Sequence, residues 1–182
     1  MKTAFITGVT GTLGRRLCAA LSYSGWSVVG YSRDEFKQSS LAELRGPNIT
    51  LVLGDIRDRD RLLESTRGVD QIFHTAALKQ VPKLEENPEE AISTNVRGTE
   101  NVLYCQRIHN IPRVTLSSTD KACYPINTYG ASKLIAERLV LRHQNNQVVR
   151  YGNVIASRGS VVPLFVESLR AAQKIDLTNE LR

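Results

Sequence analysis

One stretch in the second half of the chain carries the side chains best suited to chemistry. A hydroxyl, a carboxylate and an amine stand together at Thr119, Asp120 and Lys121. Further along, Tyr129 and Lys133 have the i, i+4 spacing that puts two side chains on one face of a helix. A lysine ammonium favours the charged form of a phenol, so it can bring a pKa of about 10 toward neutrality. We therefore expect Tyr129 to take a proton from an alcohol while a hydride leaves the same carbon.

The tyrosine and the lysine also have a plainer explanation. A pair at this spacing occurs often by chance on ordinary amphipathic helices. The surroundings favour the chemical interpretation, because the apolar run 114–116 leads into the polar residues as a buried strand would. The helical pattern then continues beyond the lysine through Leu134, Ile135, Leu139 and Val140. The polar residues thus stand at a predicted strand end, and the tyrosine and lysine stand on the helix that follows.

A second group of residues predicts a dinucleotide site near the N-terminus. Residues 3–7 form a short apolar strand, a glycine-rich turn follows, and a helical pattern runs on to Leu21. In this turn Gly8 permits the tight bend, Gly11 lets a diphosphate approach the backbone, and Gly14 lets helix and strand pack closely. Free amides at the helix start would hold the pyrophosphate, although a merely structural turn is the alternative. The expected cofactor contacts are Gly8, Thr10, Gly11, Thr12, Leu13 and Gly14.

The end of the second predicted strand, residues 28–31, bears on the choice of cofactor. A site that prefers NAD usually has an acid there, which binds the ribose hydroxyls. Here the position falls on Ser32, and Arg33 follows. A hydroxyl and a guanidinium suit a 2′-phosphate, so the sequence favours NADP. The alternative is a surface arginine, and the neighbouring Asp34 leaves NAD open.

Further candidates follow the later strands. The third predicted strand, 49–53, is followed by Asp55, which could bind an adenine amino group or serve as a turn or helix-capping acid. The fourth, 69–74, ends in His74, which we expect to be packed rather than catalytic. Small residues after it leave space for a cofactor, and a polar amide in the next long helix needs a bonded partner. These further candidates are Ala76, Ala77 and Asn95.

Strands and helices alternate through the chain, with a sixth strand expected at residues 148–149 and a last helix at 164–173. This alternation implies a parallel, doubly wound sheet, which is an α/β fold of the Rossmann type. We expect an NADP-binding domain over residues 1–155 and the start of a substrate-binding region over residues 156–182, incomplete at the C-terminus. Ligands bind at the carboxyl ends of such strands. Several candidates fall there: Gly8, Arg33, Asp55, Ala76, Thr119 and Asn153.

Composition limits the classes of function. The 182 residues, with 41% apolar and 23% charged content, are ordinary for a soluble globular protein. The net charge of +6 comes from scattered residues, so it suits an anionic nucleotide and does not require a nucleic acid. The three cysteines lack a metal-ligand spacing and indicate reduced thiols in the cytoplasm. We expect neither a signal peptide nor a membrane span, which would need roughly 20 apolar residues.

Taken together, these motifs resemble those of the extended short-chain dehydrogenase/reductases. The closer resemblance is to the soluble UDP-N-acetylglucosamine 4,6-dehydratases of polysaccharide biosynthesis, and it covers nearly the whole chain. Tyr129 and the start of the first strand directly after Met1 are similar to the soluble, C5-inverting branch, which begins pseudaminic acid synthesis. Lys121 departs from the dTDP-glucose dehydratases, which typically have a glutamate there. The stretches that carry the resemblance are 76–82 (AALKQVP), 118–122 (STDKA), 150–154 (RYGNV) and 157–163 (SRGSVVP).

The resemblance implies a reaction with assigned roles. Tyr129, assisted by Lys133, takes the C4 hydroxyl proton as hydride passes to NADP⁺, while Thr119 holds the C4 oxygen. Lys121 removes the C5 hydrogen and Asp120 protonates the leaving C6 hydroxyl, after which hydride returns to C6. We also expect a homo-oligomer that binds a UDP-sugar. The resemblance adds cofactor contacts from Ile56, Lys79, Tyr151 and Val154, and substrate contacts from Lys79, Gln80, Asn153 and Arg158.

Two departures leave other functions open. Family members run to roughly twice the usual domain size, with a C-terminal region that covers the sugar nucleotide, whereas this chain ends at Arg182. Gln80 stands where the relatives are expected to have a histidine. One alternative is an NADP-binding module without turnover. The other is an epimerase or reductase for a related sugar, which shares Tyr129 and Lys133 but does not need the pair formed by Asp120 and Lys121.

Overall fold

A computed structural model describes residues 1–40, 46–155, 161–171 and 174 of the chain. The chain divides into two units, Met1–Tyr151 and Gly152–Arg182, and each is described by itself. The division falls close to the domain boundary expected after residue 155. The functions expected of the two parts remain predictions.

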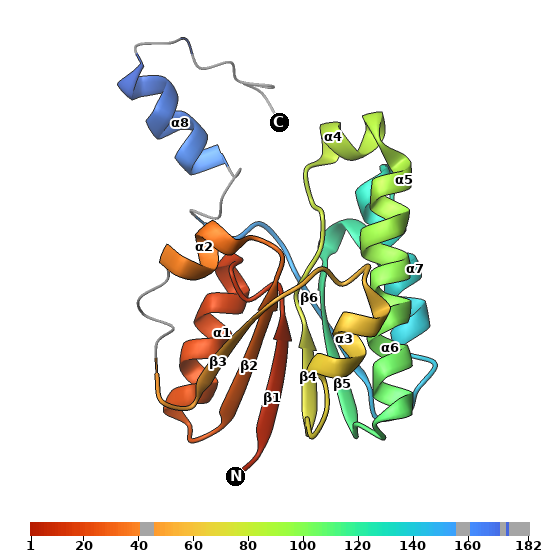
Figure 1. Ribbon diagram of the computed structural model, residues 1–182. Helices are drawn as coiled ribbons and strands as arrows, with labels where there is room; N and C mark the ends of the chain where they lie inside the picture. The colour runs from red at the N-terminus through yellow and green to blue at the C-terminus, as the bar shows by residue number, and fades with distance from the viewer. Residues whose placement is uncertain (41–45, 156–160, 172–173, 175–182) are drawn as a thin grey trace. The chain divides into compact units, whose positions relative to one another are not determined.

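The first unit is built on a six-stranded sheet in which every strand runs parallel to its neighbours (Figure 1). The strand order is β3-β2-β1-β4-β5-β6, so the winding of the chain reverses between β1 and β4. This order confirms the doubly wound α/β fold of the Rossmann type. The strands are β1 (Thr3–Thr7), β2 (Ser27–Ser32), β3 (Ile49–Leu53), β4 (Gln71–His74), β5 (Arg113–Thr119) and β6 (Gln147–Tyr151).

Helices cover both faces of this sheet (Figure 1). On one face α1 packs against β1 and β2, and on the other α3, α6 and α7 pack side by side. The helices of the first unit are α1 (Thr12–Tyr23), α2 (Glu35–Ser40), α3 (Arg59–Ser65), α4 (Val81–Glu86), α5 (Pro88–Ala91), α6 (Gly98–Ile108) and α7 (Thr128–Val140). In the second unit, the helix expected at residues 164–173 is α8 (Val161–Arg170).

Two hydrophobic clusters, one on each face, hold the sheet in place. In β1, Phe5 belongs to the cluster that includes Leu62 of α3 and Val102 of α6, whereas its neighbour Ile6 packs in the cluster with Cys18 of α1. Successive side chains of a strand point to opposite faces. Phe5 and Ile6 are nevertheless both fully buried, because each face of the sheet is covered. Continuous apolar runs such as this one are typical of parallel strands.

The long helix expected from Pro88 is present, but its winding changes along its length. α5 passes directly into a π-helical segment, Ile92–Arg97, and then into α6. The wide turn contains Asn95, which is 1% exposed. Because π-helical turns are frequent at functional sites, this turn marks the residue whose contacts are described below.

β5 and α7 present the stretch that the sequence singles out for chemistry. β5 runs beyond the expected residues 114–116, so that Thr119 is its last residue, and a 3₁₀ turn, Asp120–Ala122, follows. α7 then starts at an N-cap, where the Asn127 side chain accepts a hydrogen bond of 2.8 Å from the amide of Gly130. The strand end and the first turn of the helix are thereby joined by a short, ordered connection.

Gly130 sets how closely α7 approaches the turn after β5. A Cβ at this position would overlap the backbone carbonyl oxygen of Lys121. We expect Gly130→Ala to lower the free energy of unfolding in urea by about 1–3 kcal/mol, although alanine forms helices better than glycine does. Gly98→Ala is the matched control, because the added Cβ there meets the flexible end of the Ile56 side chain. Equal losses in the two variants would contradict this account.

Candidate functional site

The glycine-rich turn between β1 and α1 has the geometry of an anion site. Gly8 has a φ of 68°, in the left-handed region that glycine adopts without strain. A Cβ on Gly8 would lie 2.8 Å from Ala76 Cα, so the turn packs directly on the loop after β4. Gly11 caps α1 without a side-chain hydrogen bond, and the first turn of the helix holds no acidic residue. The free amides and partial positive charge of this helix start suit a pyrophosphate.

A buried chain of hydrogen bonds fixes the loop after β4. The Thr7 hydroxyl oxygen accepts bonds from the amide of Ala76 (3.2 Å) and from that of the residue before it (3.1 Å). Its proton therefore goes to His74 Nδ1, 2.7 Å away. The ring proton of His74 is then on Nε2, which donates to Thr99 Oγ1 at 3.1 Å, and Thr99 donates to the Asn95 carbonyl oxygen at 2.6 Å. His74 is the packed strand-end histidine that the sequence predicts.

Asn95 holds the same loop from the helix side. Its Oδ1 accepts a bond of 2.8 Å from the amide of Leu78, and its Nδ2 donates to the Leu78 carbonyl and to Ser132 Oγ, both at 3.0 Å. Ser132 precedes Lys133 on α7 and donates to the Tyr129 carbonyl oxygen at 2.8 Å. The Asn95 amide is therefore engaged within the protein. This geometry shows that Asn95 joins loop and helix, while the direct cofactor contact expected of it stays a prediction.

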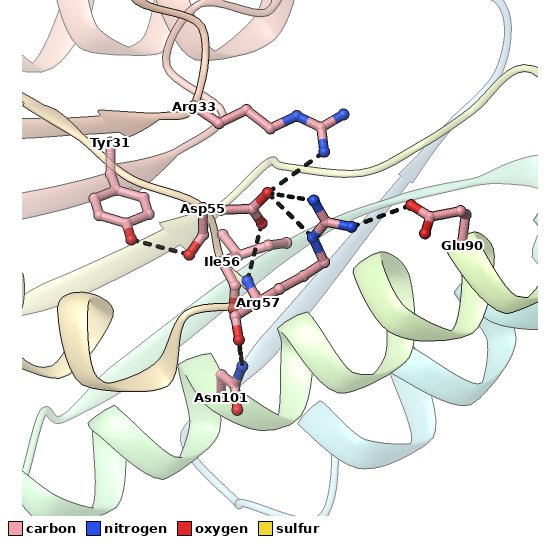
Figure 2. A network of polar contacts seen from close by, with 7 residues as sticks. All are labelled: Tyr31, Arg33, Asp55, Ile56, Arg57, Glu90 and Asn101. Carbon is pink, nitrogen blue, oxygen red and sulfur yellow. Dashed lines mark hydrogen bonds and ion pairs between the residues drawn. The ribbon is translucent and has the colours of Figure 1, made fainter.

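The ends of β2 and β3 carry a network of charged side chains, which Figure 2 shows. Asp55 Oδ2 lies 2.8 Å from Arg57 Nη2 and 3.5 Å from Arg33 Nη1. Arg57 reaches on to Glu90 of α5, with 3.1 Å between Nη1 and Oε2. Burial would raise the pKa of Asp55, but the hydrogen bonds from Arg57 outweigh it and lower that pKa. Two guanidinium groups thus meet at one ionised carboxylate beside the strand ends.

Arg57 is the member of this network that sequence reasoning missed, although its place just past a strand end was a visible signal. Its backbone amide donates to Asp55 Oδ1 at 3.0 Å, and its Nε and Nη2 donate to Oδ2 at 3.1 and 2.8 Å. Asp55 therefore fulfils the turn role that was one of its two expected functions. Ile56 between them is 4% exposed, with its side chain in the core, so the cofactor contact expected of it stays a prediction for its backbone.

Ser32 and Arg33 present a hydroxyl and a guanidinium at the end of β2. Ser32 is buried, and its hydroxyl oxygen accepts a bond of 2.9 Å from Gln38 Nε2. The Arg33 side chain is 51% exposed. Asp34, which left NAD open, forms an ion pair with Lys37 on the first turn of α2. Its negative charge is therefore compensated locally by Lys37, while Arg33 pairs with Asp55.

The catalytic candidates from β5 and α7 form a chain of polar contacts. The Tyr129 hydroxyl lies close enough to the Thr119 side chain for a hydrogen bond to act on its pKa. Thr119 Oγ1 donates to Asp120 Oδ1 at 2.9 Å, and Lys121 Nζ donates to the same oxygen at 3.2 Å. The structure thus brings together, at the carboxyl end of β5, four of the residues that the sequence nominates for catalysis.

Two expected charge states in this chain are not those of the structure. Burial raises the pKa of Tyr129, and the hydrogen bond with Thr119 opposes it without cancelling it. The lowered phenol pKa expected from Lys133 is therefore wrong for this arrangement. Hydrogen bonds from Thr119 and Lys121 lower the pKa of Asp120, so this group is held as a carboxylate. A role as proton donor would need its acid form.

Lys133 is the fifth catalytic candidate and lies beneath the surface of α7. It is 2% exposed, and no residue of the described part of the chain accepts a hydrogen bond from its Nζ. Burial lowers the pKa of Lys133 to about 8, and the Glu137 carboxylate opposes this lowering. Buried ammonium groups normally have their donors satisfied. The open donors of Lys133 therefore fit the ribose hydroxyls of a bound dinucleotide.

The remaining predicted contacts lie in three places. The loop between β4 and α4 holds three of them: Ala77, Lys79 and Gln80. Tyr151 is the last residue of β6 and lies close enough to Tyr129 to raise the pKa of its phenol. The second unit holds two more: Asn153 and Val154. Arg158 falls outside the described residues, and the contacts expected of all seven stay predictions.

Comparison with known proteins identifies the family of the chain. The sequence profile of the family described as "Polysaccharide biosynthesis protein" matches residues 4–181. The chain belongs to this family. It is 41% identical over 191 residues to a UDP-glucose 4-epimerase of Rickettsia rickettsii (strain Sheila Smith), a match that covers 97% of the chain and 56% of that relative. It is 40% identical over 190 residues to a UDP-N-acetylglucosamine 4,6-dehydratase (inverting) of Campylobacter jejuni, covering 98% and 57%.

Solved structures of this family and of its neighbours have the same fold. The X-ray structure of Pen from Bacillus thuringiensis is 38% identical with a TM-score of 0.92, over 98% of this chain and 58% of that one. A dTDP-glucose 4,6-dehydratase (DesIV) of Streptomyces venezuelae, solved with NAD, is 26% identical with a TM-score of 0.84, over 97% and 65%. These matches confirm the extended short-chain dehydrogenase/reductase fold and the resemblance to the 4,6-dehydratases. The chain spans about 56% of the length of the curated relatives it matches.

In the described part of the chain, no group of three or more histidine, cysteine, aspartate or glutamate side chains could hold a metal ion. None of its helices combines the length and the apolar character needed to cross a bilayer.

Buried His74 makes the stability of the fold depend on pH. Burial, with a smaller contribution from Lys133, lowers the pKa of His74 to about 3. The unfolded chain takes up this proton below about pH 6.5, whereas the folded protein does not until about pH 3, so acid favours unfolding. We expect His74 to reduce the free energy of unfolding by about 1 kcal/mol per pH unit between about pH 6 and pH 4. Urea denaturation across this range measures the slope.

The matched variant for this measurement is His74→Gln, which removes the titration while keeping hydrogen-bonding capacity. Its free energy of unfolding should be lower at neutral pH but should fall less steeply with acid. A slope equal to that of the parent protein would show that other groups are responsible.

Proposed function

We propose that this chain serves a nucleotide-sugar 4,6-dehydratase that acts on UDP-N-acetylglucosamine with NADP and inverts C5. The observation that carries the proposal is that Thr119 Oγ1 and Lys121 Nζ both donate to Asp120 Oδ1, beside the Tyr129 phenol. Oxidation of an alcohol needs only the tyrosine with Lys133. The adjoining acid and amine supply what removal of water additionally needs, namely one group that accepts a proton and one that donates it. The inverting dehydratase of Campylobacter jejuni, 40% identical, supports this choice.

The residues present fit a nicotinamide dinucleotide. The free helix start after Gly11 suits the pyrophosphate, and Arg33 beside Ser32 suits a 2′-phosphate, with Arg57 as a second nearby cation. The open donors of buried Lys133 suit ribose hydroxyls. Such a cofactor supplies a hydride acceptor for C4 and later returns the hydride to C6. Residues 1–155 form the NADP-binding part in this proposal, and residues 156–182 begin the part that binds the sugar.

Tyr129 and Lys133 carry the oxidation. The phenol must lose its proton before it can accept one from the C4 hydroxyl, and burial works against this in the structure. Lys133, four residues on and without a bonded acceptor among the described residues, is the cation that would offset part of this cost. Thr119, beside the phenol, would hold the C4 oxygen during the transfer.

Asp120 and Lys121 carry the elimination. In the structure Asp120 is held as a carboxylate, 3.2 Å from the Lys121 ammonium. When the site closes and water leaves, a proton that moves along this contact turns the ion pair into an amine and a carboxylic acid, because burial disfavours both charges. The amine then takes the C5 proton, the acid protonates the leaving C6 hydroxyl, and water departs. Each group regains its starting charge. As hydride returns to C6, C5 takes up a proton, which balances the one that Tyr129 took from the C4 hydroxyl.

An epimerase is the second candidate, because the Rickettsia rickettsii relative at 41% identity carries that name. It would use Tyr129 and Lys133 as the dehydratase does, whereas Asp120 and Lys121 would only form a surface ion pair. An NADP-binding module without turnover is a third. The test is incubation of the longest chain that carries this sequence with NADP and UDP-N-acetylglucosamine, followed by mass spectrometry. Loss of one water with a 4-keto group supports the dehydratase; an isomer of unchanged mass supports the epimerase; cofactor binding without any product supports the module.

Cofactor preference depends on Arg33 in this proposal. Its guanidinium can pair with a 2′-phosphate, which NAD lacks, so Arg33→Ala should weaken NADP binding about tenfold or more and leave NAD binding nearly unchanged. Titration calorimetry with both cofactors measures the difference. Arg142→Ala, which removes an exposed arginine just after α7, is the matched control and should change neither. Equal weakening of NADP and NAD by Arg33→Ala would rule out the assignment.

Substitutions should distinguish the two halves of the proposed reaction, oxidation at C4 and elimination of water. Tyr129→Phe should abolish the first oxidation, so that no transient NADPH absorbance appears. Lys121→Ala should leave oxidation in place but slow removal of the C5 proton by about 10²–10⁴-fold, the usual contribution of a positioned acid or base. NADPH and a 4-keto sugar should then accumulate, and exchange of the C5 hydrogen with solvent deuterium should vanish. Dehydration at the parent rate in Lys121→Ala would leave the mechanism without its base.

A further inference from the structure

Glu137 is a buried acid on α7 that the proposed reaction does not use. It is 2% exposed, yet it lies among charged and polar groups from three elements. Ser118 of β5 donates to its Oε1 at 2.5 Å. Arg150 of β6 binds it through two nitrogens, with Nε 2.9 Å from Oε1 and Nη2 2.5 Å from Oε2. Burial would raise the pKa of Glu137, but these bonds outweigh it and lower the pKa, so the group is a carboxylate.

The position of Glu137 relates it directly to the catalytic pair. Tyr129, Lys133 and Glu137 follow each other at the i, i+4 spacing, so they stand on one face of α7. Lys133, in the middle, has no hydrogen-bonded partner in the described residues, and Glu137 is the acid that acts on its charge. A carboxylate with two bonds from Arg150 and one from Ser118 cannot swing toward solvent. It therefore presents a fixed negative charge one helical turn from the lysine.

We propose that Glu137 is a positioning residue for Lys133: its carboxylate, fixed between Ser118 and Arg150, keeps the buried lysine charged and aimed at the cofactor and Tyr129. The inference rests on the proposed function for its catalytic meaning. Its electrostatic part stands on the geometry alone. A buried ammonium is otherwise unfavourable, because transfer out of water disfavours the charged form. The carboxylate offsets that cost without occupying the donors that a ligand would use.

The groups that face this pair come from each element packed against it. Lys133 is faced by neutral His74 of β4 and by Glu137 on its own helix, and Tyr129 stands one turn before it. Glu137 is faced by Ser118 of β5, by Arg150 of β6 and by Lys133. Arg150 also contacts the exposed thiol of Cys123, with 3.3 Å between Nη1 and Sγ. Among these groups, Glu137 is the acid that can stabilise the charge on Lys133.

The sign of the effect makes the inference testable. With Glu137 in place, burial sets the pKa of Lys133 at about 8, so the lysine is mostly charged at pH 7. Loss of the negative charge should lower this pKa further, and the neutral form should then dominate near neutrality. A variant that merely loosened the helix would admit water and would raise the pKa back toward the ordinary value of about 10.4. The two explanations therefore move the titration in opposite directions.

The experiment is NMR titration of the lysine side chains in ¹³C-labelled protein, with the Lys133 signal assigned by its loss in Lys133→Met. We expect the midpoint of Lys133 to fall by about one pH unit or more in Glu137→Gln, the usual size for loss of one close opposite charge. In Glu137→Asp, which keeps the charge, it should stay within a few tenths of a unit. In an active enzyme, Glu137→Gln should also move the alkaline limb of kcat to lower pH and leave KM for the sugar nearly unchanged.

Two additions keep the outcome decisive. If Glu137→Gln does not fold, the double variant Glu137→Gln/Arg150→Met removes both charges of the pair, so that the guanidinium is not left without its carboxylate, and a smaller fall in the same direction is expected. Reaction of the exposed Cys123 with a thiol reagent checks that the turn beside the site is intact. A Lys133 midpoint that is unchanged or raised overturns the inference. A lowered midpoint in a protein that dehydrates no sugar supports the role of Glu137 and counts against the proposed function alone.

Discussion

A continuous chain of buried hydrogen bonds underlies the arrangement of this protein. It starts at Thr7 on β1, passes through His74 and Thr99 to Asn95, and ends at Ser132 on α7. Every member is buried, so any broken link would leave an unsatisfied polar group at a cost of about 1–3 kcal/mol. This series of bonds joins β1, which leads into the glycine-rich turn, to α7, which carries Tyr129 and Lys133. The loop after β4 and α7 are therefore fixed relative to each other.

The electrostatics of the site follow from that rigidity. His74 is kept neutral by burial, so it adds no lasting positive charge beside Lys133. Glu137, bound by Arg150, supplies a fixed negative charge instead. Lys133, between the neutral ring of His74 and the fixed carboxylate of Glu137, therefore keeps its charge, and its N–H donors have no acceptor among the described residues. The fold thus prepares a cation at the place where a dinucleotide and a phenol would meet.

Dehydration and epimerisation differ by few residues on this scaffold. Both chemistries begin with oxidation at C4, and relatives named for each reaction are 40% and 41% identical to the chain. What separates them is whether an acid and an amine stand within reach of C5 and C6. In the proposed function, the pair Asp120 and Lys121, which Thr119 links to the neighbourhood of the phenol, would meet that requirement. The two candidate reactions would then share the fold and differ in the short turn after β5.

The sequence by itself determined the elements and their order. The runs of apolar residues predicted each strand, and the positions of the glycines predicted the turn from Gly8 to Gly14. The sequence also predicted polar residues at the end of β5. These features depend on local preferences and on strand ends meeting at one edge of a parallel sheet. The sequence also indicated the family through stretches such as STDKA. These signals come from residues that are neighbours in the sequence, so they can be recognised without the structure.

Only the tertiary structure decided which charges the site residues carry. The spacing of Tyr129 and Lys133 suggested a lowered phenol pKa, yet burial raises it, and burial depends on helices and strands far apart in sequence. Asp120 became a fixed carboxylate through its neighbours, and Asn95 proved to hold the loop at Leu78. Arg57 and Glu137 were missed for the same reason. Their importance lies in contacts with Glu90 of α5 and Arg150 of β6, which belong to other elements, and such pairs leave no periodic signal in the chain.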